Sequence, residues 1–468
     1  MRWARAAVAL AVVGLLATAQ AQAAVDRSPP ANPHLGPLGS ATMHGDAESS
    51  DTTPLPGPGA AVRARFVELG AACPTILVGG DGIPQALCTA VVDRAPTVFL
   101  LNPATGDPVA ELRLRRGGLL GGVYAYLDDR NRMVTADGSG DLLWVAHDGA
   151  RLFVERRLPI AAAVTGHCGK PGCDTFASAT PDWAGRIWFA TEHAVVGTAD
   201  PRTGAVRATA LPVGESVQNS LSSAPGGVAV ATDRALYLLT AGPDGTPRVR
   251  WRRAYDRGPA RKPGQLSWGT GATPTFFGPA SGSEYLAITD NAAPREHLLV
   301  YRAASGTPVC SVPVFAPGAS GTENSPIGVG RSVFVASTYG YPYPAGAIGP
   351  SVPAAGPVAG GLARIDVTAA GCATTWTSDV KSAAVPRLSL ADGKLYTVVR
   401  RTRLPGGQST PLDDYFYTVL DAATGRLDAQ AYLGTGAPFD TLQMVGSIAA
   451  GRVQYQGAVS GLFRIAPQ

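Results

Sequence analysis

Several polar residues lie beside stretches of sequence that are typical of β-strands, and their side chains carry groups that bind ligands. Carboxylate and amide oxygens near strand ends suit a cation, a sugar hydroxyl or a polar head group. The alternative is that these residues cap turns through hydrogen bonds to nearby backbone. The candidates are Asn219, Asp290, Asn291, Glu323 and Asn324, next to the apolar stretches 226–232, 283–289 and 331–337.

A second group of candidates lies in the segment MHGDAESSD (43–51), which holds His44, Asp46 and Asp51 within eight residues. If this segment enters a binding site, His44 suits a general base or a metal ligand. If it belongs to a leader, the same side chains are solvated, and the polar composition around them favours this second interpretation.

A third candidate is Tyr339, in the Pro- and Gly-rich stretch 338–361. This composition predicts a long surface loop over a site rather than strands. Tyr339, Tyr341 and Tyr343 could alternatively form a surface that binds a partner protein.

The six cysteines predict disulfides, because the chain carries an export signal. Cys73 and Cys88 flank a predicted hairpin, and Cys168 and Cys173 flank a tight Gly-Pro turn. Cys310 and Cys372 remain, each at the start of an extended stretch. A metal site at His167, Cys168 and Cys173 is the less favoured alternative, since no second ligand pair stands at zinc-like spacing.

The first 23 residues have the pattern of a secretory signal peptide, with Arg2 and Arg5 before an apolar stretch and small residues at its end. Residues 24–61 form a Pro/Gly/Ser-rich arm, and 62–468 form the main domain. The first cysteine is Cys73, which excludes a lipid anchor near the cleavage site. We therefore expect a secreted or periplasmic protein.

The charge pattern is that of an ordinary globular surface. The net charge is +4, only 16% of residues are charged, and the basic residues are scattered. We expect a monomer that binds no nucleic acid and has no membrane span. Motifs for serine hydrolases, zinc proteases, nucleotide binding and EF-hands do not occur in the sequence.

An apolar stretch followed by a Gly turn and a second extended stretch recurs every 40 to 65 residues or so. The turn glycines are Gly106, Gly149, Gly204, Gly245, Gly306, Gly371 and Gly425. Four strands per repeat are typical of a β-propeller. The sequence predicts an all-β fold, a single eight-bladed propeller, with seven blades as the alternative.

The last predicted strand, 461–467, lacks an outer neighbour, while the extended stretch 62–69 belongs to no repeat. Pairing the two would close the ring and leave no open sheet edge. The predicted blades are 72–114, 121–159, 176–212, 222–256, 272–316, 325–378, 385–433, and 441–467 with 62–69.

The segments DWAGRIWFAT, VGTADPRTGAV and LDAATGRLDAQA resemble secreted bacterial propellers of the quinoprotein (PQQ-binding-like) superfamily. The segment QNSLSSAPGGVAVATDRALY resembles a subgroup of secreted propellers. This second resemblance implies no activity. The resemblance implies a fold over 62–467. Quinoprotein dehydrogenases hold the quinone between an adjacent-Cys disulfide and a Trp, with a bound Ca²⁺. No two cysteines are adjacent here, which disfavours PQQ, and Trp268 could equally be a core residue.

We expect an exported propeller that binds a polar small molecule, a glycan or a peptide at the mouth of its channel. Two alternatives use other chemistry: a metal-assisted lyase or hydrolase, with Ca²⁺ as a candidate, or a degenerate quinoprotein oxidoreductase. A protein-interaction scaffold is a third reading. The sequence does not decide whether the chain is an enzyme.

Overall fold

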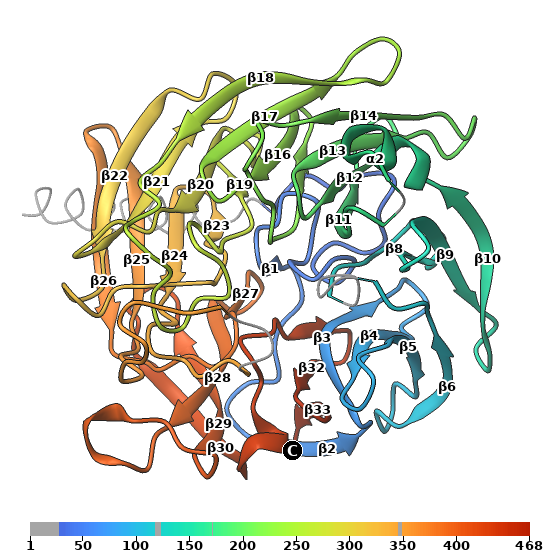
Figure 1. Ribbon diagram of the computed structural model, residues 1–468. Coiled ribbons are helices and arrows are strands. Elements are labelled where there is room, and N and C mark those ends of the chain that lie inside the picture. Colours follow the sequence, from blue (N-terminus) through green and yellow to red (C-terminus); the bar gives the residue numbers. More distant parts are fainter. Residues whose placement is uncertain (1–27, 118–122, 171, 345–348) are drawn as a thin grey trace, which may run out of the picture.

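The computed structural model describes residues 28–117, 123–170, 172–344 and 349–468. The predicted signal peptide lies outside these residues. Eight sheets stand around a central axis (Figure 1), and all their strand pairs are antiparallel except β1 (Thr52–Thr53) with β27 (Arg387–Ser389). The number of sheets confirms eight blades and removes the seven-bladed alternative.

The first four blades follow one another along the chain, each built from four strands. Their strands are β3 (Ala71–Val78), β4 (Pro84–Ala90), β5 (Pro96–Leu101) and β6 (Pro108–Arg113); β7 (Tyr126–Leu127), β8 (Met133–Ala136), β9 (Asp141–His147) and β10 (Leu152–Pro159); β11 (Phe176–Pro181), β12 (Ile187–Thr191), β13 (Val195–Ala199) and β14 (Val206–Ala210); β15 (Ser222–Ala224), β16 (Gly227–Ala231), β17 (Ala235–Ala241) and β18 (Pro247–Ala254).

The last four blades repeat the pattern, and two of them take in strands from the N-terminal part of the chain. Their strands are β19 (Thr275–Phe277), β20 (Tyr285–Thr289), β21 (Glu296–Arg302) and β22 (Pro308–Val314); β23 (Ile327–Val329), β24 (Ser332–Ala336), β25 (Leu362–Thr368) and β26 (Gly371–Ser378); β27 (Arg387–Ser389), β28 (Lys394–Arg401), β29 (Asp414–Asp421) and β30 (Leu427–Thr435), with β1 (Thr52–Thr53); β31 (Ser447–Ala449), β32 (Val453–Ala458) and β33 (Gly461–Pro467), with β2 (Val62–Glu68).

Helical structure is minor. The sequence did not indicate the eight-residue helix α2 (Ala161–Cys168), and η3 (Pro405–Gly407) and η4 (Ala437–Phe439) are short turns. Among the described residues, no helix has both the length and the apolar character needed to span a bilayer.

The recurring Gly turn has a common physical basis. The side chain that opens the turn accepts hydrogen bonds from backbone N–H groups two or three residues later, and the glycine adopts positive φ. The opening residues are Asn102, Asp200 and Asp421, and the glycines are Gly106, Gly204 and Gly425 with φ of 82°, 76° and 71°. Because a side chain at positive φ is strained, these turns leave a visible signal in the sequence.

The ring is closed as predicted. Strand β2 pairs antiparallel with β33 along its whole length, from Val62 opposite Pro467 to Glu68 opposite Gly461. The ring of Phe66 lies 4.9 Å from Phe439 and 4.9 Å from Phe463, measured between centroids. The last blade therefore combines both ends of the described chain.

Three disulfides join Cys73 to Cys88, Cys168 to Cys173, and Cys310 to Cys372, which are the pairs expected from the sequence. No cysteine is free. The third disulfide connects the outer strands β22 and β26 of adjacent blades. Three disulfides are consistent with an extracellular or periplasmic protein.

Part of the arm lies inside the ring. Residues 40–53 run through the middle of the ring, where Figure 1 shows the N-terminal part of the chain in blue, and are almost all buried. We call residues 40–53 the plug. Backbone N–H groups of six blades donate to its carbonyls: Val78 to Ser40, Leu127 to Ala41, Ser223 to Ala47, Phe276 to Glu48, Gly328 to Ser50, and Leu388 to Asp51.

The plug depends on a glycine at position 45. Gly45 has φ of 91°, and a Cβ there would lie 2.6 Å from Nη1 of Arg387 and 2.7 Å from the Thr52 carbonyl oxygen. Gly45→Ala should therefore cost about 2–4 kcal/mol of unfolding free energy, from backbone strain and overpacking together.

The matched control is Gly149→Ala, at φ of 90° with no heavy atom within 4 Å of the added Cβ. It should cost only about 1–2 kcal/mol. Urea denaturation of both variants measures the difference. Equal losses would mean that the plug does not pack tightly around position 45.

Candidate functional site

A cavity of about 270 Å³ opens at the mouth of the central channel. Most of its walls come from segments that lead into the innermost strands of the blades, which all begin at this end of the ring. Met43 and His44 of the plug form part of its lining, so the plug closes the channel beneath it. The cavity is thus formed by segments from many blades of the ring rather than by one blade.

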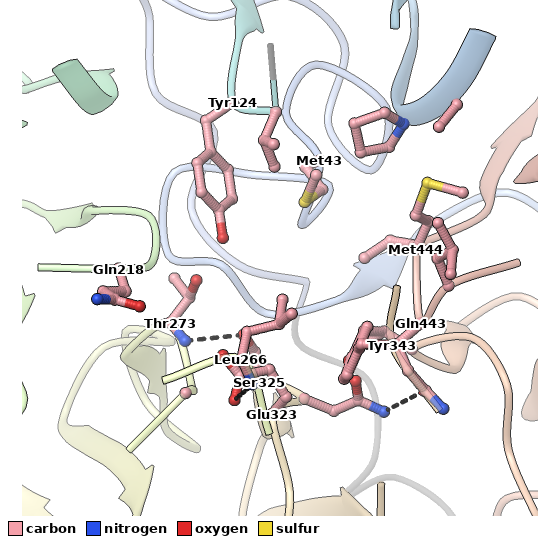
Figure 2. A pocket seen from close by; sticks show the side chains of 18 of the residues that line it. Met43, Tyr124, Gln218, Leu266, Thr273, Glu323, Ser325, Tyr343, Gln443 and Met444 are labelled. Carbon is pink, nitrogen blue, oxygen red and sulfur yellow. Dashed lines mark hydrogen bonds between the residues drawn. The ribbon is translucent and has the colours of Figure 1, made fainter. Parts of the chain in front are cut away.

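Most lining residues are apolar or aromatic. Figure 2 shows Tyr124 and Gln218 on one side, Tyr343, Gln443 and Met444 on the other, and Met43 between them. The remaining lining residues are Ala72, Pro74, Thr89, Val123, Leu266, Gly271, Thr273, Glu323, Asn324, Ser325, Pro344, Val385, Leu442 and Val445. The polar groups gather around Glu323.

Glu323 is held by the segment that precedes β19. Its Oε2 accepts a hydrogen bond from the Leu266 N–H at 2.9 Å, and its Oε1 accepts one from Ser267 Oγ at 3.3 Å. A side chain at Gly271 would collide with the carboxyl group, since a Cβ there would lie 2.2 Å from Cδ of Glu323. Burial raises the pKa of Glu323 to about 7, against an ordinary value of 4.5.

Asn324 connects two blades beside the cavity. Its Nδ2 donates to Oε1 of Gln443 at 3.0 Å (Figure 2), and Nε2 of Gln443 donates to the Ser382 carbonyl at 2.7 Å. Gln443 has positive φ, at 58°. This chain of bonds holds the segment before β31 against the segment before β23.

His44 borders the cavity from the plug. Its Nδ1 lies 3.1 and 3.0 Å from the two carboxylate oxygens of Asp51, and Asp51 faces Arg387 at 3.6 Å. Nε2 of His44 is buried and has no hydrogen-bond partner among the described residues. Since Asp51 fixes the ring through Nδ1, Nε2 is the nitrogen left to accept or donate a proton.

The expectation that residues 43–51 are solvated is wrong. His44, Asp46 and Asp51 are at most 4% exposed, because the plug carries them into the ring. Asp46 accepts hydrogen bonds from the N–H and hydroxyl of Ser50, and burial raises its pKa to about 6. Asp46 and Asp51 hold the plug together and do not line the cavity.

The predicted residues near strand ends divide into two groups. Glu323 and Asn324 line the cavity, and Asn219 is buried next to Gln218, which lines it. Asp290 and Asn291 lie elsewhere: Asp290 pairs with His297 at 2.9 Å, and Nδ2 of Asn291 donates to the carbonyls of Arg257 and Ala260. Asp290 also accepts hydrogen bonds from the N–H groups of Ala292 and His297, as the turn-capping alternative expects, whereas the Asn291 side chain bonds to backbone 31 and 34 residues away.

The three loop tyrosines do not form a surface. Tyr339, Tyr341 and Tyr343 are 6%, 3% and 8% exposed. Tyr339 packs against Gly356 and Gly321, the Tyr341 hydroxyl donates to Asp440, and Tyr343 lines the cavity. The described part of the loop therefore packs at the channel mouth, and these residues are not available to a partner protein.

Sequence reasoning missed most of the wall. Tyr124, Gln218, Leu266, Thr273, Gln443 and Met444 were not predicted. The one available signal was their position, since each lies a few residues before the innermost strand of a blade. Within the described ranges, no three His, Cys, Asp or Glu side chains are grouped so that they could hold a metal ion.

Glu323 should make stability depend on pH. Its pKa of about 7 means that the folded protein keeps a proton that the unfolded chain loses above pH 4.5. The free energy of unfolding should therefore fall as pH rises from 4.5 to about 7, and then level off.

Glu323→Gln should remove this component and gain about 1–3 kcal/mol relative to the parent between pH 5 and pH 8. Urea denaturation at both pH values measures the gain. Asp46 and Glu296, with pKa values of about 6 and about 8, also titrate in this range, and they do so in both proteins. Their contributions therefore cancel when the stability of the parent is subtracted from that of Glu323→Gln. If the free energies of unfolding of the parent and of Glu323→Gln change with pH in the same way, Glu323 does not have the raised pKa.

Comparisons with known proteins concern the fold. No protein-family model matches the chain, and no curated protein matches it. A europium-containing methanol dehydrogenase is similar in structure with a TM-score of 0.54 and 9% identity, over 91% of this chain and 98% of that one. The quinohemoprotein alcohol dehydrogenase from Comamonas testosteroni has a TM-score of 0.50 and 12% identity, over 96% and 83%.

The quinone cofactor of such dehydrogenases does not fit the residues present. None of the three disulfides joins adjacent cysteines. Trp268 does not line the cavity, and the Arg257 guanidinium lies over its ring at 3.8 Å. The plug fills the channel below. The chain thus has a propeller fold similar to that of these two dehydrogenases, and its described residues lack an adjacent-cysteine disulfide and a cavity-lining tryptophan that could hold the quinone.

Proposed function

We propose that this protein is an exported binding protein that takes up a small molecule in the cavity at the channel mouth. The observation that carries the proposal is the cavity itself, an opening of about 270 Å³ with apolar walls and a few polar groups around Glu323. Apolar concave pockets with a small number of placed polar groups are the usual form of ligand sites.

The cavity favours one of the three predicted ligand classes. Its volume of about 270 Å³ lies just below the range of about 300–1,000 Å³ that is typical of small-molecule sites. A glycan or peptide would need an extended groove, and the walls offer more apolar than polar contact. We therefore assign a small molecule with an apolar body and at least one polar group.

A substitution that fills the cavity tests the proposal. Ala72 lines the cavity and is partly exposed, so Ala72→Trp should occupy the space while the blade keeps its fold. Ala150→Trp, on an exposed turn outside the ring, is the matched control. A panel of small aromatic compounds should raise the melting temperature of the parent and the control, but not of Ala72→Trp. Equal responses in all three proteins would refute the proposal.

His44 favours a second candidate, an enzyme that moves a proton on the bound molecule. A histidine oriented by a carboxylate, with its other nitrogen free, is the arrangement of a general base. Diethylpyrocarbonate should modify His44 in the folded protein, and a compound bound in the cavity should slow the reaction. If His44 resists the reagent until the protein unfolds, Nε2 is not accessible and the enzyme candidate fails.

A further inference from the structure

The cavity has an unbalanced charge. Of its lining residues, Glu323 is the only acid, and no lysine or arginine lines it. His44 also lines the cavity, and its ring is paired with Asp51. A ligand that meets this surface therefore finds a carboxyl group without a cation beside it.

A basic side chain whose charge acts on Glu323 is engaged elsewhere. Arg261 acts on Glu323 only through its longer-range charge, and its guanidinium donates to the carbonyls of Gln265, Gly349 and Pro350. No ion pair joins Glu323 to any basic side chain among the described residues. The hydrogen bonds from Leu266 and Ser267 stabilise the carboxyl group but bring no formal charge.

The walls around this carboxyl group suit a cation with an apolar body. The aromatic rings of Tyr124 and Tyr343 and the thioethers of Met43 and Met444 all line the cavity (Figure 2). Aromatic faces attract organic cations, and methionine side chains adapt to irregular apolar shapes. An ammonium group attached to an aromatic or alkyl body would match both features.

We propose that the ligand of the cavity is a small organic ammonium ion, whose charged nitrogen pairs with Glu323 and whose apolar body packs against Tyr124, Tyr343 and the two methionines. This inference rests on the proposed function and specifies its ligand class. The inference also gives a reason for the presence of Glu323, which lowers the stability of the ligand-free protein. The bound ligand would supply the positive charge that the cavity lacks.

Three isosteric probes separate the charge from the apolar body. Calorimetric titration at pH 8 should use 2-phenylethylamine, 2-phenylethanol and phenylacetate. The amine should bind at least tenfold more tightly than the alcohol, and phenylacetate should bind more weakly than either. Glu323→Gln should reduce the affinity for the amine to that for the alcohol, and Ala72→Trp should abolish binding of both.

The possible outcomes decide between the two proposals. If the alcohol binds the parent as tightly as the amine, and Ala72→Trp abolishes both, the charge inference is overturned while the binding cavity stands. If none of the three binds at millimolar concentration, the proposed function itself loses its support. Amine binding that survives Ala72→Trp would lie outside the cavity, and an amine affinity that is unchanged in Glu323→Gln would contradict the pairing with Glu323; either result would overturn the inference.

The pH dependence gives a second readout. Because Glu323 has a pKa of about 7, binding of a cation below this pH must displace a proton. The dissociation constant for 2-phenylethylamine should rise about tenfold from pH 8 to pH 6. The other charged or titratable groups that act on Glu323 or line its cavity are Arg261, His44, Tyr124, Tyr343 and Glu296.

Glu296, whose pKa burial raises to about 8, is a group of this set whose protonation could weaken cation binding over the same pH range. Glu323→Gln separates the two, because the residual binding of this variant should not change between pH 8 and pH 6. A tenfold change that persists in Glu323→Gln would assign the effect to another group, such as Glu296, and contradict the pairing with Glu323.

Discussion

A chain that ends at Ser460 should lose cooperative unfolding altogether. The truncation removes β33, which lies between β32 and β2 in the last blade. Leu462, Phe463 and Ile465 are fully buried in this strand, and their loss exposes the facing sides of two adjacent blades. Strand β2 would have no partner, so the ring would be open at the junction of its two ends.

The loss of cooperative unfolding should be large because β33 is needed to close the ring. Without β33, the free edges of β32 and β2 carry unpaired N–H and C=O groups, and apolar side chains between adjacent blades become exposed. Thermal unfolding followed by circular dichroism should change from a single sharp transition to a broad, weak one. A control that lacks only residues 467 and 468, both exposed, should lose no more than about 1 kcal/mol. A sharp transition at the parent temperature after truncation at Ser460 would contradict ring closure by β2 and β33.

Arg387→Met should be the most damaging substitution in the centre of the ring. Arg387 is fully buried, and its Nη2 donates to the Met43 carbonyl at 2.6 Å while its Nε donates to the Gly446 carbonyl at 3.0 Å. Methionine would remove these bonds and leave Asp51 buried without its cation. Breaking a buried pair in this way costs about 3–5 kcal/mol. Urea denaturation at pH 7 measures the loss.

A double-mutant cycle shows whether the loss comes from the charge on Asp51. Asn tolerates the left-handed backbone that Asp51 adopts, with φ of 55°, and it is neutral. Asp51→Asn combined with Arg387→Met should recover at least half of the lost stability, because no unpaired charge remains. A loss below 1 kcal/mol for Arg387→Met alone would mean that Arg387 does not hold the plug.

The architecture could be predicted because its determinants are local. The turns at Gly106, Gly204 and Gly425 combine a capping Asn or Asp with positive φ, and both requirements restrict residue type. The strands between them favour β-branched and aromatic residues. Even the pairing of 62–68 with 461–467 follows from counting one spare strand and one missing partner.

The cavity could not be predicted to the same extent, because its residues are adjacent only in space. Glu323 precedes an innermost strand, β23, whereas Asp290 follows the second strand of its blade, β20. Both lie at the same end of the ring, but Asp290 is one strand further from the axis. In the sequence, Glu323 and Asp290 both stand next to a strand and cannot be told apart. In the structure they differ because their strands lie at different distances from the axis of the ring.

The plug was misjudged for a related reason. A segment rich in Pro, Gly, Ser and Asp resembles a leader, since it has too few apolar residues to form a core of its own. Its stability comes from backbone hydrogen bonds to strands as distant as Leu388, more than 300 residues away along the chain. Such contacts leave no periodic pattern in the segment itself.

A crystal structure of the protein soaked with 2-phenylethylamine tests the central claim most directly. The ammonium nitrogen should lie within hydrogen-bonding distance of the Glu323 carboxylate, with the ring among Tyr124, Tyr343 and Met444. Density for the amine only at other surfaces, with the cavity at the channel mouth unchanged, would contradict the account.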